Sequence, residues 1–153
     1  MINIKGIIPA IPTPFTSTGA VNVPELERIL AFLIKAGVHG IFAVGNAGEF
    51  YALDMEEKRQ VLRATMKATD KKIPVFFGAG SPSTAESIRL AQMAEAEGAD
   101  ALSVITPYVI KPSEDELYSY YEAVCKATTL PVLPYNNPAV TGIAITPRLM
   151  SKL

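Results

Sequence analysis

Three apolar segments of the chain each run directly into a polar turn, and this arrangement restricts the possible folds more than any other feature. The segments are Ile41–Val44, Leu102–Ile105 and Pro131–Leu133, and the turns that follow them occupy residues 45–49, 106–108 and 135–138. If the segments are parallel strands, all three turns lie at one end of a sheet, where α/β proteins place their chemistry. The sequence therefore predicts an α/β protein whose functional residues lie at the carboxyl ends of its strands.

Helix-start signals separate the apolar segments. Asn22 with Pro24, the pairs Asp54/Glu57, Ser83/Glu86 and Ser113/Glu116, and Thr146 with Pro147 predict five helix N-termini, the middle three as capping boxes. The expected helices run to about residues 36, 69, 97 and 128, and Leu153 cuts the last one short. The strands expected between them are Gly6–Ile11, Gly40–Val44, Pro74–Gly78, Ala101–Ile105 and Pro131–Tyr135. A strand followed by a helix, repeated along the chain, predicts right-handed βαβ units and a parallel sheet buried on both faces.

Two architectures fit five such units. A (β/α)8 barrel of the TIM type needs about 250 residues, so residues 1–153 would form only the N-terminal portion of a single barrel domain. A complete, open, doubly wound sheet of five strands fits the length as it stands. The pattern alone leaves both open.

Composition argues against several classes of partner. Fourteen basic and fifteen acidic residues give a net charge of -1, which provides no basic surface for nucleic acid or for a membrane. Lys5, Gly6 and three prolines interrupt the apolar N-terminal stretch, so it is not expected to span a membrane. The single cysteine, Cys125, is interpreted as a buried small hydrophobe in a helix, and a chain without a disulfide is expected in the cytoplasm.

The sequence also implies no metal and no cofactor. One histidine and one cysteine do not make a zinc site. Gly78 and Gly80 lack the third glycine of a dinucleotide fingerprint, and the turn at 45–49 lacks the lysine of a phosphate-binding loop.

Two strand-end features are candidates for chemistry. The glycine-flanked turn Gly45–Glu49 can direct backbone N–H groups toward an anion such as a carboxylate, although many such turns are only turns. Tyr135 ends a predicted strand, where its phenol is either a proton relay or hydrogen-bond donor, or a structural group. Tyr108 is placed similarly, but Pro107 beside it makes a packing or subunit-contact role equally consistent.

Taken together, the turns at 45–49, 106–108 and 135–138, with Thr141-Gly142 after the last, resemble those of the dihydrodipicolinate synthase and N-acetylneuraminate lyase family. The opening segment Pro9–Phe15 and the Gly78-Ala79-Gly80 turn fit the same family, so the likeness covers essentially all 153 residues. The resemblance implies a (β/α)8 barrel, a homotetramer or homodimer, and carbon–carbon bond chemistry on pyruvate, a 2-keto acid, through a lysine Schiff base.

The resemblance also assigns residue roles. It implies that Asn46, Ala47 and Gly48 belong to the turn whose amides hold the pyruvate carboxylate, and that Tyr135 is the catalytic tyrosine that shuttles protons. Tyr108 and Asn137 are expected to contribute to substrate binding, and Asn46 or Asn137 is a candidate partner for hydroxylated carbons.

Three positions depart from the family pattern. Ala47 lacks the hydroxyl that is usual there, Val109 stands where synthases carry a second tyrosine, and Val140 stands where they carry an arginine that grips the carboxylate of aspartate semialdehyde. Without that guanidinium the acceptor carboxylate loses a bidentate partner. We therefore expect a 2-keto-3-deoxy sugar acid aldolase-like substrate, with dihydrodipicolinate synthase activity on pyruvate and aspartate semialdehyde as the alternative.

The Schiff-base lysine of the family ends the sixth strand, beyond the helix in which this sequence finishes. The lysines present fall on predicted helices or surface loops, and Lys111 is expected to be solvated. The 153-residue chain by itself is therefore expected to be inactive as a carbon–carbon lyase. A non-catalytic half-barrel that serves as a binding or assembly module, and an unrelated anion-binding α/β domain, are the other interpretations.

Overall fold

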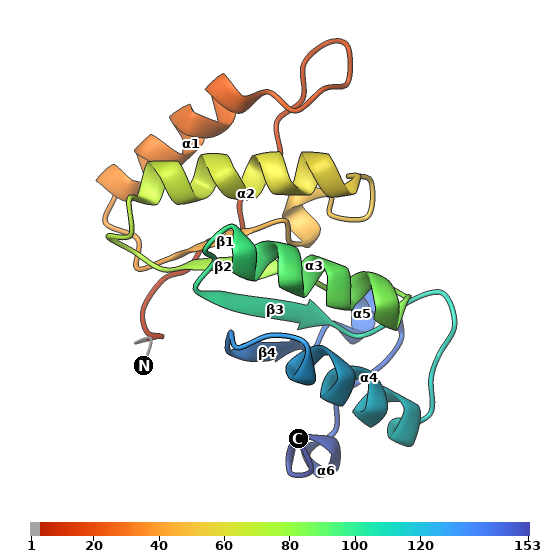
Figure 1. Cartoon of the computed structure of the whole chain (residues 1–153). Helices are drawn as coiled ribbons and strands as arrows, with labels where there is room; N and C mark the ends of the chain where they lie inside the picture. Colours follow the sequence, from red (N-terminus) through yellow and green to blue (C-terminus); the bar gives the residue numbers. More distant parts are fainter. Residues whose placement is uncertain (1–3) are drawn as a thin grey trace.

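The computed structural model of the protein describes residues 4–153 (Figure 1). Its helices are α1 (Val23–Lys35), the 3-10 turn η1 (Asn46–Gly48), α2 (Met55–Thr69), α3 (Thr84–Ala96), α4 (Glu114–Lys126), α5 (Pro138–Thr141) and α6 (Pro147–Met150). Its strands are β1 (Ile41–Ala43), β2 (Val75–Gly78), β3 (Ala101–Ile105) and β4 (Val132–Tyr135). The predicted alternation of strands and helices is thus present, with η1 and α5 as additional short elements.

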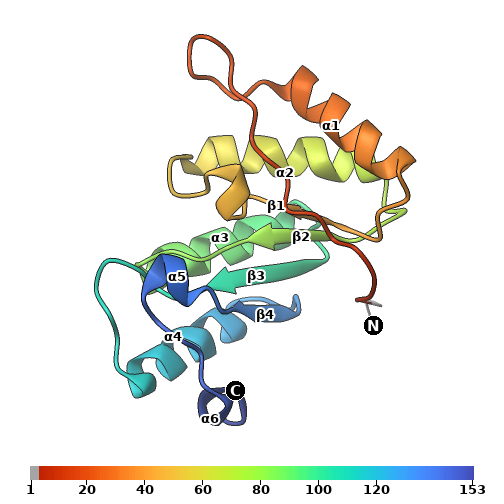
Figure 2. The ribbon, with the colours of Figure 1, turned by 180° about the vertical axis from the view of Figure 1, so that it is seen from behind.

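The sheet is parallel and its strands follow the order of the sequence, β1-β2-β3-β4. Figures 1 and 2, which view the molecule from opposite sides, show α2, α3 and α4 on the same face of this sheet. A doubly wound sheet reverses its strand order at a switch point and carries helices on both faces. Sequential order with helices on one face is the arrangement of a (β/α)8 barrel wall.

The prediction of a first strand at Gly6–Ile11 is wrong. Only an isolated parallel bridge joins Ala10 to Phe42 of β1, with Phe42 N–H donating to the Pro9 carbonyl at 2.9 Å and Ile11 N–H donating to the Phe42 carbonyl at 3.0 Å. The nitrogen of Pro9 lies on the same side of the chain as its carbonyl and has no hydrogen to donate. The ladder to β1 therefore stops after one bridge.

The predicted helix starts are confirmed, with one difference. Asp54 with Glu57 and Ser113 with Glu116 form complete capping boxes. At α3, Ser83 accepts from Glu86 N–H as predicted, but the Glu86 carboxylate pairs with Arg89 at 2.6 Å instead of returning to the cap. Asn22 and Thr146 each accept a backbone N–H from the first turn of their helices. Local sequence signals thus locate every long helix.

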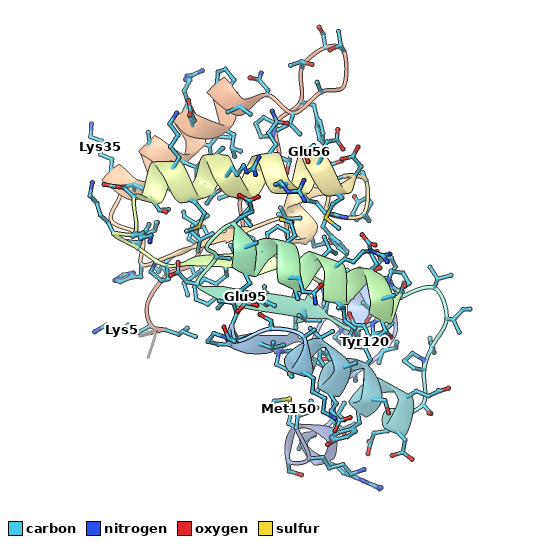
Figure 3. All side chains as sticks on the ribbon, in the orientation of Figure 1. Lys5, Lys35, Glu56, Glu95, Tyr120 and Met150 are labelled. Atoms are coloured by element: carbon cyan, nitrogen blue, oxygen red, sulfur yellow. The ribbon has the colours of Figure 1, made fainter. Side chains whose placement is uncertain are left out.

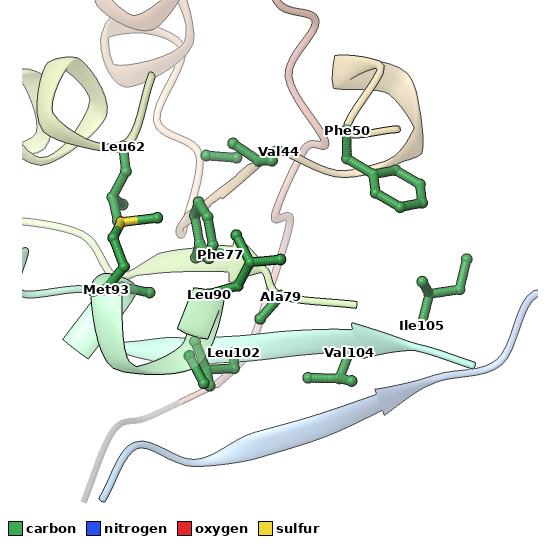
Figure 4. Close-up of a cluster of buried hydrophobic side chains, with 14 of the residues drawn as sticks. Val44, Phe50, Leu62, Phe77, Ala79, Leu90, Met93, Leu102, Val104 and Ile105 are labelled. Atoms are coloured by element: carbon green, nitrogen blue, oxygen red, sulfur yellow. The ribbon is translucent and has the colours of Figure 1, made fainter. Parts of the chain in front are cut away.

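The main core lies between the sheet and the helices that cover it. Figure 4 shows Leu62 of α2 and Met93 of α3 meeting one another beside Phe77 of β2, with Leu102 of β3 in the same cluster. All four side chains are buried, whereas charged side chains such as Lys35 and Glu56 lie on the outer surface (Figure 3). Within residues 4–153, none of the helices combines the length and the apolar character needed to cross a lipid bilayer.

The prediction that Cys125 is buried is also wrong, because its side chain is exposed. Tyr121 and Val124 occupy the inward face of α4 and are fully buried. The next residue after Val124 is turned about 100° around the helix axis, and this places it toward solvent.

Candidate active site

The connection from β1 to α2 is a strained turn. Val44 adopts a φ of 58° and Glu49 a φ of 55°, and η1 lies between them. A positive φ is a rare conformation for a β-branched residue, and it is held only where the surrounding structure enforces it. The turn is therefore a shaped feature of the fold and not a loose loop.

The hydrogen bonds of this turn decide which amides it can offer. Gly48 N–H donates to the Gly45 carbonyl at 3.0 Å and Glu49 N–H donates to the Asn46 carbonyl at 3.1 Å. The N–H groups of Asn46 and Ala47 are the first donors of the 3-10 turn and have no partner within it. An anion at this turn would therefore meet the amides of Asn46 and Ala47, whereas the Gly48 amide is engaged internally.

Glycines allow the neighbouring strand ends to approach this turn. A Cβ on Gly78 would lie 2.0 Å from the Val44 carbonyl oxygen, and one on Gly80 would lie 2.8 Å from the backbone nitrogen of Ile105. A Cβ on Gly45 would lie 2.7 Å from the ring of Phe42. None of the three positions has room for a side chain. The signal in the sequence is the glycines at the ends of β1 and β2.

Tyr135 ends β4 and meets β1 across the sheet. Its ring packs edge-on against Phe42, with ring centroids 6.1 Å apart and an interplanar angle of 85°. In a flat sheet, strands separated by two others lie about 14 Å apart and their side chains stand parallel. The contact therefore requires a strongly curved sheet whose concave face brings Phe42 and Tyr135 together.

A small hollow lies at this concave face, at the carboxyl ends of the strands. It is lined by Phe42, Val44, Gly45, Asn46, Phe50, Gly78, Gly80, Ser103, Ile105 and Tyr135. Its enclosed volume is about 10 Å³, room for about one water molecule. Two of the predicted site residues, Asn46 and Tyr135, thus share one hollow.

The other predicted site residues lie outside that lining. Gly48 is buried against the Ile11 carbonyl, Ala47 is exposed, and Tyr108 packs edge-on against Phe50 with centroids 5.7 Å apart. Burial raises the pKa of the Tyr108 phenol. The roles of Ala47, Gly48, Tyr108 and Asn137 in substrate binding stay predictions.

Asn137 is connected to Tyr135 directly. Its Nδ2 donates to the Tyr135 hydroxyl oxygen at 3.1 Å. Behind it, the buried hydroxyl of Thr106 donates to that of Thr141 at 2.8 Å, and Thr141 in turn lies 3.2 Å from the Asn137 carbonyl oxygen. Asn137 is therefore hydrogen-bonded through its backbone carbonyl to the threonine pair behind it and through its side chain to the phenol at the end of β4.

Sequence reasoning missed Phe42 and Ser103 as lining residues. Both lie inside strands, and a strand alternates its side chains between the two faces of the sheet. Ser103 is the one polar residue within Ala101–Ile105, and this is the signal that could have identified it.

No lysine lines the hollow in the part of the chain that the structure describes. Lys58 on α2 is half-buried, and this burial lowers the pKa of its amine, but it lies on a helix outside the lining. Lys111 is exposed, as predicted. Among residues 4–153 there is also no group of three or more His, Cys, Asp or Glu side chains that could hold a metal ion.

Comparisons with known proteins identify relatives of the whole chain. It is 43% identical over 148 residues to an Escherichia coli (strain K12) protein named "Putative 2-dehydro-3-deoxy-D-gluconate aldolase YagE", covering 97% of this chain and 49% of the relative. It is 39% identical over 149 residues to 4-hydroxy-tetrahydrodipicolinate synthase of Syntrophus aciditrophicus (strain SB), covering 97% of this chain and 51% of that enzyme. The chain therefore spans about half the length of the curated relatives it matches.

Solved structures agree with the sequence comparisons. The structure of YagE from E. coli K12 in complex with pyruvate matches with a TM-score of 0.93 at 42% identity, over 96% of this chain and 49% of YagE. Dihydrodipicolinate synthase DapA-2 of Bacillus anthracis matches with a TM-score of 0.96 at 33% identity, over 99% of this chain and 52% of that chain. These matches, with the sheet order and curvature described above, establish part of a (β/α)8 barrel.

The sequence model of the Dihydrodipicolinate synthetase family matches residues 3–153, which is nearly the whole chain. The parallel sheet in sequential order β1-β2-β3-β4 agrees with that match. The chain belongs to the dihydrodipicolinate synthetase family.

Proposed function

We propose that this chain forms the keto-acid-binding part of a pyruvate-dependent lyase or synthase that acts through a lysine Schiff base. The observation that carries the proposal is the shared hollow, which Tyr135 lines together with Gly45 and Asn46 of the turn. A carboxylate binds well to unpartnered backbone amides, and a phenol can donate and accept a proton at a reacting oxygen. A relative in this family, YagE, has been solved in complex with pyruvate.

In the proposed reaction, the N–H groups of Asn46 and Ala47 hold the carboxylate of the keto acid. An amine attacks the ketone carbon, the carbonyl oxygen leaves as water, and a carbon–nitrogen double bond forms. Tyr135 moves the proton that this exchange requires. Because the enclosed hollow has the volume of about one water molecule, the keto acid would lie over its mouth, between the turn and the phenol.

The amine in this proposal comes from outside the described residues. None of the lysines among residues 4–153 lines the hollow. A Schiff-base lysine needs a fixed position against the carbonyl and a desolvated environment. We therefore propose that the 153-residue chain alone does not form the imine.

For the second substrate, we propose a 2-keto-3-deoxy sugar acid or a related aldol substrate. Val140 is 51% exposed and offers no cation to a carboxylate. Relatives of both kinds match at similar identity, one named as a 2-dehydro-3-deoxy-D-gluconate aldolase and others as 4-hydroxy-tetrahydrodipicolinate synthases. Synthesis from pyruvate and aspartate semialdehyde is therefore the alternative, and comparing the two conversions in one preparation separates them.

Borohydride trapping tests the central proposal. The chain and a longer protein that contains it are each incubated with pyruvate, reduced with borohydride and weighed by mass spectrometry. We expect an adduct on the longer protein and none on the 153-residue chain. An adduct on a lysine of the short chain, or none on either form, would contradict the proposal.

A second candidate function is binding without catalysis. The absence of a lysine from the hollow, within the described residues, favours this candidate for the chain in isolation. A half-barrel module would bind pyruvate, seen as amide shifts at residues 46 and 47 by NMR, without forming an adduct in any form. Assembly into a homodimer or homotetramer is a further proposal from the family resemblance, and sedimentation measures it. A cytoplasmic location is proposed from the single cysteine, which permits no disulfide within the chain.

A further inference from the structure

The side-chain amide of Asn137 is directed at the catalytic candidate and not at the hollow. Its Nδ2 donates to the Tyr135 hydroxyl oxygen at 3.1 Å, and Asn137 does not belong to the residues that line the hollow. A residue that only contacts substrate would present its polar group to the cavity. This one presents it to the phenol.

The backbone holds Asn137 in that position. Its carbonyl accepts the N–H groups of Val140 and Thr141, each at 3.1 Å, at the start of α5. The Thr141 hydroxyl lies 3.2 Å from the same carbonyl and is itself bound by the buried Thr106 hydroxyl. These contacts restrict the backbone of Asn137 and so fix the point from which its side chain reaches Tyr135.

The phenol is restricted as well. The ring of Tyr135 packs edge-on against Phe42, and this contact limits its rotation. A phenol carries its hydrogen close to the ring plane, on one side of the oxygen or the other, and accepts hydrogen bonds on the remaining side. An N–H that donates from one side therefore leaves the other side for the O–H.

We propose that Asn137 is a positioning residue that turns the Tyr135 O–H toward the turn at Gly45 and Asn46. The inference rests on the proposed function, because it concerns the direction in which Tyr135 passes its proton. When Tyr135 has given up that proton, the same N–H still donates to its oxygen and keeps the ring in place for the return step. Asn137 thus acts through Tyr135 and needs no contact with the keto acid.

Two substitutions separate this role from direct substrate binding. Asn137→Leu has a similar size but no donor, and Asn137→Asp has the same shape but only acceptors, so it would draw the Tyr135 O–H toward itself. In the form of the protein that traps pyruvate, the rate of adduct formation is measured as a function of pyruvate concentration. We expect the limiting rate to fall about 10- to 100-fold in both variants, with the half-saturating pyruvate concentration changed less than about twofold.

Asn136 supplies the matched control. Its Oδ1 accepts the Ile145 N–H at 3.0 Å, and the hydrogen bond to the Tyr135 hydroxyl comes from Asn137 instead. Asn136→Leu should unfold at a lower urea concentration than wild type, because it loses one hydrogen bond, and should leave the limiting rate unchanged. A rate loss that appears equally in Asn136→Leu would show that any disturbance of this loop slows the reaction, and would overturn the inference.

The remaining outcomes also decide the question. Full activity in Asn137→Asp would mean that the Asn137 side chain accepts a hydrogen bond from the Tyr135 O–H, and this would overturn the proposed orientation of that O–H. A raised half-saturating concentration with an unchanged limiting rate would make Asn137 a substrate contact instead. If wild-type protein forms no adduct in any form, the proposed function fails first and the inference falls with it, whereas an active wild type with unaffected Asn137 variants rejects the inference alone.

Discussion

The two ends of the sheet are built in different ways. At the amino ends of the strands, helices α1 and α3 stop at Gly37 and Gly98, both at positive φ, with no atom closer than 3.9 Å to the place of a Cβ. At the carboxyl ends, Gly78 and Gly80 have backbone atoms within 3 Å of that place. Gly37 and Gly98 thus serve the backbone conformation, whereas Gly78 and Gly80 allow close approach.

The amino end repeats one device. His39 lies two residues after Gly37, and Asp100 lies two residues after Gly98. Each forms two hydrogen bonds with one residue, through its N–H and through its side chain: His39 with Ile7, and Asp100 with Val75. His39 Nδ1 accepts the Ile7 N–H at 3.0 Å, and Asp100 Oδ2 accepts the Val75 N–H at 2.8 Å. These contacts connect one unit to the next, so we expect the amino end to contribute to stability and the carboxyl end to the proposed chemistry.

The largest expected effect tests the chemical end. Tyr135→Phe keeps the ring that packs on Phe42 but removes the hydroxyl that would move the proton. We expect the limiting rate of adduct formation to fall about 10²- to 10⁴-fold, with a loss of unfolding free energy near 1 kcal/mol because the Asn137 N–H loses its acceptor. A rate within threefold of wild type would remove Tyr135 from the mechanism.

A change at Gly78 tests whether close approach matters more than backbone conformation. Gly78→Ala would place a methyl group 2.0 Å from the Val44 carbonyl oxygen. A Cβ is attached directly to the backbone and the oxygen is part of it, so neither can move without moving a strand end. We expect a loss of about 3 kcal/mol or more in urea unfolding. Gly37→Ala is the matched control: it meets open space and carries only the cost of a positive φ, about 1–2 kcal/mol. Equal losses would erase the proposed difference between the two ends.

The sequence predicts the starts and stops of the helices much better than the close approaches between strand ends, and the physical reason is the range of the interactions. Caps such as Asp54 with Glu57, and the helix stops at Gly37 and Gly98, depend on residues within one turn of helix. The close approach of the Val44 carbonyl to β2 requires a glycine at position 78, which is far along the chain, and no local signal indicates it.

The same reasoning explains the errors and the partial success at the candidate site. Tyr135 and Asn46 were expected at one mouth because parallel strands place their carboxyl ends together. Phe42 and Ser103 were missed because the side that a strand residue faces depends on the curvature and register of the sheet. Pro9 has no N–H to donate, so the expected first strand does not form beyond one bridge. Proline is a local signal against a strand, and the prediction of a strand at Gly6–Ile11 did not take it into account.

A substitution at Asp100 tests the amino end. Asp100→Ala removes the acceptor of the Val75 N–H, which lies in a fully buried residue. We expect a loss of about 1–2 kcal/mol in unfolding free energy, with the limiting rate of adduct formation unchanged. Asp100→Asn keeps an acceptor oxygen of the same shape and should lose less. A slowed reaction with normal stability would show that this end also contributes to the chemistry.

The smallest expected effect is a pH dependence at the same end, where Glu95 of α3 holds the residues that lead into β4 (Figure 3). Its carboxylate accepts the Thr129 hydroxyl and N–H and, at 2.8 Å, the Thr128 hydroxyl, and these hydrogen bonds lower its pKa. A carboxyl group whose pKa is lower in the folded state stabilises it above the pKa of the unfolded chain, about 4.3, and loses that contribution as the pH falls through the folded value.

Glu95→Gln should therefore unfold at lower urea concentration than wild type at pH 7, and the difference should shrink as the pH falls below about 4. Comparing the two proteins at each pH cancels the titration of the other carboxylates, among them Glu116, whose pKa its capping box also lowers. A difference that stays constant with pH would mean that Glu95 acts through its shape and not through its charge. The contacts at the amino end would then depend on packing, as those around Gly78 do, and the contrast between the two ends would be weaker than the geometry indicates.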